Sequence, residues 1–168
     1  MSMSMFQASV PVYQTMLKNL SDILVKADAS AAERKIDPAV LLSARLSPDM
    51  LPLTRQVQIT TDHAKGSVAR LAGREIMKLE DGEASFADLQ ARLGVVIDHL
   101  KGYQPAEIDG SEDRSIIMRL GGRDVEMPGT RYLLHFAMPN FYFHATTAYA
   151  ILRHNGVPLG KSDFLGRG

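Results

Sequence analysis

The stretch from Tyr132 to Leu152 constrains the fold more than any other part of the sequence, because it is strongly apolar and carries no Lys, Arg, Asp or Glu. Within it, a helix is expected from Pro139 to His154, with an earlier helical segment from Arg131. The apolar residues lie on almost every side of this helix, which predicts that it is buried by other elements. Asn155-Gly156 provides a C-terminal stop.

Three further helices are expected to surround it. Apolar residues recur at three- and four-residue steps from Pro11 to Ser30 and, more thinly, from Leu53 to Leu71. A third helix starts after Ser85, where Asp88 completes a capping-box pattern, and it ends at Gly102 before Pro105. These patterns predict a mainly α fold built as a helical bundle.

The remaining segments are expected to be mostly non-helical. Ile36 to Pro52 is punctuated by prolines and predicts a long packed loop, at most with one helical turn. From Ile116 to Met127, two alternating runs flank Gly121-Gly122, which predicts a β-hairpin before the last helix. The tail, Val157 to Gly168, is expected to run irregularly back over the bundle.

Composition limits the class of protein and its partners. A chain of 168 residues suits one domain, 1–168. Its 19 basic and 19 acidic residues balance, which argues against nucleic acid or an anionic membrane as partner and favours self-association. No cysteine is present, which excludes thiolate chemistry and is compatible with the cytoplasm. Neither a secretory signal nor an apolar run of about 18 residues is apparent, so we expect no transmembrane helix.

A polar stripe interrupts the apolar last helix. Asn140, His144 and Thr147 follow one another at four- and three-residue steps, so they share one face. An unpaired buried polar group costs about 1–3 kcal/mol. We therefore expect the stripe to meet a partner, which is either a hydrogen-bond network between helices or a pocket or metal site. His144 is expected to be mostly buried with a polar partner.

Two other histidines are weaker candidates. His63 lies on the second helix at the edge of its apolar stripe, where a histidine is more often simply solvated than functional. His135 precedes Pro139 and is interpreted first as a satisfied half-buried side chain and second as a pocket residue. No His-Glu-x-x-His pattern, phosphate-binding loop or nucleophile elbow is present.

Several motifs resemble a family of uncharacterised bacterial proteins, a domain of unknown function within the DinB/YfiT-like superfamily, along essentially the whole chain. They are Leu51-Pro-Leu-Thr-Arg-Gln-Val-Gln-Ile, Arg70-Leu-Ala-Gly73, Pro139-Asn-Phe-Tyr-Phe-His144, Arg153-His-Asn-Gly-Val-Pro158 and Asp163-Phe-Leu-Gly166. The resemblance implies a DinB-like four-helix bundle with up-down-down-up connection, and a homodimer.

The resemblance also implies a question about metal. The superfamily commonly binds a divalent metal through three histidines, one from the second helix and two from an i, i+4 pair on the last. Here His144 falls at the second position of that pair, Asn140 at the first, and His63 is the candidate on the second helix. Asparagine is a poor ligand for zinc or nickel. Any zinc or nickel site is therefore expected to be weaker than the superfamily's usual one.

Two functions remain open from the sequence. In the first, a small molecule binds between the second and fourth helices, beside Asn140, His144, His63, Thr147 and His135. Should this be an enzyme, His144 is the expected ligand or general base, and the resemblance implies metal-assisted hydrolysis or thiol-conjugate chemistry. In the second, the protein is non-catalytic and dimeric, and the Asn140–His144 stripe only fixes helix register.

Overall fold

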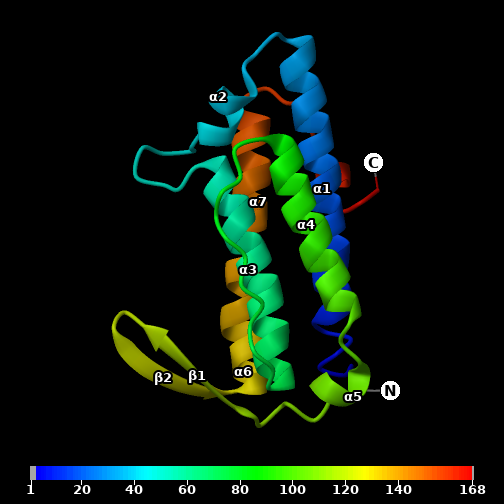
Figure 1. Cartoon of the computed structure of the whole chain (residues 1–168), viewed down its shortest axis with the longest axis vertical. Coiled ribbons are helices and arrows are strands. Elements are labelled where there is room, and N and C mark those ends of the chain that lie inside the picture. The colour runs from blue at the N-terminus through cyan, green and yellow to red at the C-terminus, as the bar shows by residue number, and fades with distance from the viewer. Residues whose placement is uncertain (1–2, 168) are drawn as a thin grey trace.

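The computed structural model describes residues 3–167 and shows four long helices packed side by side (Figure 1). They are α1 (Val10–Glu33), α3 (Leu53–Ala72), α4 (Phe86–Lys101) and α7 (Met138–His154). Figure 1 shows α1 running up, α3 and α4 down, and α7 up. The expected up-down-down-up bundle is therefore confirmed.

The parallel arrangement of α3 and α4 needs a long connection between them. Helix α3 stops at Gly73, whose φ of 68° is the left-handed conformation that favours glycine at a helix end. Residues 73–85 then run back along the bundle in extended form (Figure 1). At the far end, Ser85 and Asp88 form the expected capping box and start α4.

Three short helices lie in segments that were expected to be irregular or to end a helix. They are α2 (Pro38–Ser43), α5 (Pro105–Ile108) and α8 (Lys161–Phe164). Prolines open α2 and α5, where a missing N–H costs nothing and the fixed φ suits the first turn. In the tail, the Asp163 carboxylate accepts the Gly160 N–H and starts α8, which packs against α1. The prolines thus mark helix starts as well as helix ends.

The hairpin forms where it was expected. Strand β1 (Ser115–Leu120) pairs antiparallel with β2 (Arg123–Pro128), with Met118 opposite Val125. Gly121 and Gly122 take φ values of 56° and 81°, the pair of positive angles that a two-residue hairpin turn requires. The hairpin projects from the lower end of the bundle (Figure 1).

The last helix is entered through a widened turn. Helix α6 (Gly129–Tyr132) continues as a π-helical turn, η1 (Leu133–Ala137), into α7. Pro139 has no N–H, and its ring would clash with the carbonyl of His135 in a regular α-helix. The wider π-turn before Pro139 relieves that clash.

The expectation that the last helix is buried on almost every side is corrected by the structure. Phe141, Ala145, Ala148, Ile151 and Leu152 lie in the core. Tyr142 and Phe143, however, are 37% and 56% exposed. The helix packs against α3 and, less extensively, α1, and within residues 3–167 no other long helix covers its outer side. Apolar composition alone did not separate these two sides.

The core lies between the four long helices. Tyr13 of α1 packs edge-on against Phe141 of α7, with ring centroids 4.7 Å apart, and both are completely buried. The same core cluster contains buried leucines of α3 and α4. Among residues 3–167, no helix is both long and apolar enough to span a bilayer.

Candidate functional site

Three polar residues of α3 lie on one line along the helix. Gln56, His63 and Arg70 are spaced by seven residues, and at 100° per residue a step of seven returns to within about 20° of the same direction. This side of α3 faces α6, η1 and α7, because all three side chains contact residues of those elements. Together with His144 of α7, these residues are called the seam below.

The centre of the seam is a pair of stacked histidines. The rings of His63 and His144 are 5.8 Å apart between centroids and inclined by only 15°. Phe136 of η1 lies 6.2 Å from the His63 ring, and Phe143 lies edge-on to His144 at 5.1 Å. Both imidazoles are half-buried. His63 is therefore packed between two rings and is not a simply solvated residue.

A buried glutamine fixes the tautomer of His144. The Gln56 amide nitrogen donates to the Leu51 carbonyl, so the amide oxygen is turned toward α7. That oxygen lies 2.7 Å from Nδ1 of His144, which must therefore carry the proton and donate it. Nε2 of His144 is left as the unprotonated nitrogen, the arrangement that prepares a histidine to accept a proton or a ligand.

Both imidazoles are neutral at pH 7. Burial, the neighbouring His144 ring and the Arg70 charge lower the pKa of His63 to about 4, against an opposing effect of Asp62. Burial also lowers the pKa of His144. The pair therefore presents lone pairs, and no positive charge, to any molecule that meets it.

The three residues of the predicted polar stripe of α7 have different kinds of hydrogen-bond partner. Only His144 reaches another helix. Asn140 donates from Nδ2 to the Phe136 carbonyl at 2.7 Å, and Thr147 donates to the Phe143 carbonyl at 2.7 Å, so both are satisfied within their own chain segment. His144 has the expected polar partner, but it is half-buried where we expected it to be mostly buried.

His135 does not join the site. Its side chain is exposed and borders an open surface depression with Pro128, Thr130 and Arg131. The widened turn of η1 directs Phe136, the next residue, toward His63. The expectation of a half-buried His135 is thus wrong, since the π-turn changes the rotation of this segment.

The residues present do not match a three-histidine metal centre. Within residues 3–167, no group of three or more His, Asp, Glu or Cys side chains is placed to hold a metal ion. His63 and His144 supply two imidazoles. At the position expected for the third, the Asn140 amide already bonds to the backbone. Two imidazoles fall short of the three protein ligands that zinc sites usually need.

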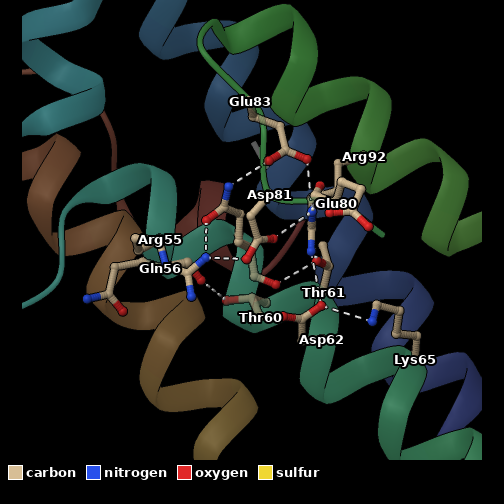
Figure 2. A network of polar contacts seen from close by, with 11 residues as sticks. Arg55, Gln56, Thr60, Thr61, Asp62, Lys65, Glu80, Asp81, Glu83 and Arg92 are labelled. Carbon is tan, nitrogen blue, oxygen red and sulfur yellow. Dashed lines mark hydrogen bonds and ion pairs between the residues drawn. The ribbon is translucent and has the colours of Figure 1, made fainter. Parts of the chain in front are cut away.

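A second polar region lies on the α4 side of α3 and involves Arg92 (Figure 2). The Arg92 side chain is only 2% exposed. It bonds to Thr61 at 2.7 Å and to the Glu80 carbonyl at 3.1 Å, and it pairs with Glu83 at 2.9 Å. Asp62 and Asp81 complete the set at 3.0 and 3.1 Å.

The partners of Arg92 are themselves engaged, as Figure 2 shows. Lys65 pairs with Asp62 at 3.0 Å, Arg55 pairs with Asp81, and Gln58 donates to Glu83 at 2.6 Å. Three positive charges thus meet three negative ones. This group, called the clasp below, ties the connection of residues 73–85 to α3 and α4. It explains how the parallel pair of helices is held.

Sequence reasoning missed Gln56, Arg70 and Arg92. The seven-residue spacing of Gln56, His63 and Arg70 was a usable signal for the seam, since polar residues repeated on one helix face point to one neighbour. Nothing comparable marks Arg92, because its partners come from α3 and from an extended connection whose course the sequence pattern does not show.

The family comparisons agree with this architecture. A family model described as "Domain of unknown function (DUF1993)" matches residues 5–165. A crystal structure of a DinB family member protein from Shewanella denitrificans has 41% sequence identity and a TM-score of 0.87. The match covers 96% of this chain and 91% of that one. No curated protein matches the chain.

Proposed function

Because this chain belongs to the DUF1993 family and is DinB-like, we propose that it binds a small molecule at the seam between α3 and α7. The carrying observation is the stacked pair of neutral, half-buried imidazoles, His63 and His144. In residues 3–167, His63 forms no hydrogen bond, and His144 uses only Nδ1. Half-buried polar groups with unused bonding capacity are typical of binding sites, where a ligand satisfies them.

The orientation of His144 supports the same proposal. The buried amide of Gln56 holds the His144 imidazole in one tautomer and leaves its Nε2 free. A histidine fixed in this way accepts a hydrogen bond from a ligand without reorganising. Should the bound molecule react, Nε2 of His144 is the group that takes up its proton.

The test is a binding experiment that observes the histidines directly. Imidazole C–H resonances of the protein are followed by NMR while benzamide, benzoate, phenylacetamide and phenylacetate are added separately. Resonances of His63 and His144 are expected to shift, and those of exposed His154 to stay unchanged. His144→Ala should abolish the shifts at His63, whereas the control His154→Ala should not. Shifts at neither seam histidine with any of the four would contradict the proposal.

A second candidate function is self-association, favoured by the outer side of α7. From Met138 to Leu152 this helix carries no Lys, Arg, Asp or Glu, although 23% of the chain is charged. Its exposed side presents Tyr142, Phe143 and Thr146. Exposed aromatic residues without neighbouring charges are typical of protein interfaces.

The shape of this outer side fits a second copy of the chain. An open recess of about 420 Å³ is lined by Leu46, Tyr142, Phe143, Thr146, Thr147 and Ala150. The aromatic residues lie toward the start of α7, and the small ones follow. In an antiparallel pair about a twofold axis, Phe143 of each copy enters the small-residue part of the other, so the surface is self-complementary.

This candidate is tested by the mass in solution. Light scattering at micromolar concentration should give a dimer for the wild type and a monomer for Phe143→Glu. The matched control Ile117→Glu removes a similarly exposed apolar side chain on the hairpin and should leave the dimer intact. A monomeric wild type, or a Phe143→Glu dimer of unchanged affinity, would contradict it.

A further inference from the structure

Arg70 is a half-buried cation with no acidic partner. In the part of the chain that the structure describes, its guanidinium forms no ion pair, and its one hydrogen bond goes from Nη1 to the Tyr132 hydroxyl at 3.3 Å. Arg92, by contrast, meets three carboxylates. A guanidinium offers five N–H donors, so most of those of Arg70 are unused.

The Arg70 side chain folds back along α3 toward the histidines. Its Nη1 lies where a side chain at Gly66 would begin, 2.9 Å from the position of a Cβ there. The missing side chain of Gly66 therefore makes room for the guanidinium one turn closer to His63. The effect of the Arg70 charge on the pKa of His63 agrees with this direction.

A row of aromatic rings joins Arg70 to the histidine pair. The guanidinium carbon lies 5.9 Å from the Tyr132 ring, and Tyr132 stacks on Phe136 at 6.0 Å. Phe136 lies 6.2 Å from His63, which stacks on His144. Tyr132 is buried and the other four are half-buried. The row thus has a positive charge at one end, flat apolar surfaces in the middle and neutral imidazoles at the other end.

We propose that the ligand of this site is a small organic carboxylate with a flat or apolar body, an inference that rests on the proposed binding function. The carboxylate pairs with Arg70, the body lies along Phe136 and His63, and the far end meets Nε2 of His144. Planar guanidinium and planar carboxylate match in a two-bond fork. Arg70 is the cation that contacts this row of rings, and a single cation balances one negative charge. This favours a monoanion over a phosphate.

The test compares acids with amides of the same shape. Binding of benzoate and phenylacetate to the full chain is measured by NMR titration of the His63 and His144 resonances, against benzamide and phenylacetamide. Each acid should bind about tenfold more tightly than its amide, as expected when a charged hydrogen bond is gained. Arg70→Gln should remove this preference. The control Arg131→Gln removes an equal charge from an exposed side chain of α6 and should keep the preference.

The outcomes separate the two proposals. Equal binding of acid and amide, or an acid preference that survives in Arg70→Gln, overturns the carboxylate inference and leaves the seam as a site for neutral ligands. No shift of either histidine with any probe contradicts both proposals. If Arg70→Gln does not fold, Arg70→Lys replaces it: the charge stays but the fork is lost, so the preference should shrink. In the wild type, added chloride should weaken binding of the acids and leave the amides unaffected.

Discussion

Helix α3 carries two polar regions that differ in how completely their groups are satisfied. Neighbouring residues belong to different regions: Asp62 pairs with Arg92 in the clasp, and His63 stacks on His144 in the seam. In the clasp, three cations meet three anions, and each nitrogen of the Arg92 guanidinium has a partner. In the seam, His63 and most of the N–H donors of Arg70 have no hydrogen-bond partner within residues 3–167.

We interpret this difference as one between a structural role for the clasp and the proposed binding role for the seam. A buried charge that is fully paired holds its elements together, and removing one partner leaves the others stranded. A half-buried polar group without a partner does not stabilise the fold, so another reason for its presence is needed. The clasp accordingly fixes the connection between α3 and α4, and the seam is the region where we propose that a ligand binds.

The largest effect is expected from breaking the clasp. Arg92→Met leaves Glu83, Asp81 and Asp62 without their shared cation and should lower the free energy of unfolding by about 3 kcal/mol. Urea denaturation measures this. Arg119→Met is the matched control. Arg119 is exposed and forms a loose ion pair with Asp124 at 3.8 Å, so no measurable loss of stability is expected. A loss below about 1 kcal/mol for Arg92→Met would show that the clasp is dispensable.

The seam and the clasp should also affect the free energy of unfolding in different pH ranges. The pKa of His63 falls from 6.5 to about 4 in the folded chain, so the unfolded chain binds that proton first. Stability is therefore full above about pH 6.5 and falls between pH 6.5 and 4. The loss is roughly 1–2 kcal/mol, allowing for solvent that screens a half-buried side chain.

The clasp responds at lower pH. Burial alone would raise the pKa values of Asp81 and Glu83, but Arg92 together with Arg55 or Gln58 outweighs it and holds them below 3.8 and 4.5. Their contribution is present above those values and is lost as the pH falls further. Urea denaturation across pH 8 to 3 should show both phases. His63→Gln should reduce the first phase, leaving the part that comes from the lowered pKa of His144, and should keep the second phase. A single phase below pH 4 in the wild type would contradict this assignment.

Adding a third imidazole to the seam should raise its affinity for a metal ion. Asn140 lies one turn before His144, so Asn140→His should raise zinc or nickel affinity by about tenfold or more. Elemental analysis after dialysis measures metal per chain. Thr146→His, which places an imidazole on the exposed side of α7, is the control. Full metal occupancy in the wild type, or no gain in Asn140→His, would show that the seam geometry differs from this account.

A smaller effect is expected when Gln56 no longer fixes the tautomer of His144. Gln56→Met keeps the volume of the side chain but removes the acceptor, which should cost about 1 kcal/mol. The imidazole ¹⁵N shifts of His144 should change from a single Nδ1–H form to a mixture of tautomers. An unchanged Nδ1–H population would mean that Gln56 does not position the ring.

The fold was predictable where the pattern of apolar residues within one segment identifies a helix. The apolar faces, the Ser85 capping box and the Gly121-Gly122 turn are local signals, and they placed the long helices and the hairpin. The turn of helix allowed between Ile36 and Pro52 is α2, whereas α5 and α8 were missed because the proline and glycines of those segments were taken as breaks. The exposed outer side of α7 was missed because apolar composition does not say how many neighbours a helix has.

The site was predictable only in part, for geometric reasons. His144 was identified because it interrupts an apolar helix. His63 was placed at the edge of one apolar stripe, but α3 packs against both α4 and α7, and that edge is the side facing α7. Arg70 and Gln56 gain meaning only once the rotation of α3 against α7 is known. The π-turn that brings Phe136 to His63 depends on how the chain accommodates Pro139.

The most direct test of the contrast between clasp and seam is the stability of His63→Leu at pH 7.5. We expect a neutral histidine without a hydrogen bond in the described chain to contribute little to folding, and leucine offers Phe136 an apolar contact in its place. Urea denaturation should therefore give a free energy of unfolding equal to that of the wild type or up to about 1 kcal/mol higher. Binding of the seam probes should be lost in the same variant. A loss of about 2 kcal/mol or more would show that His63 is a structural residue like Arg92, and the seam would then not be a binding site maintained at a cost to stability.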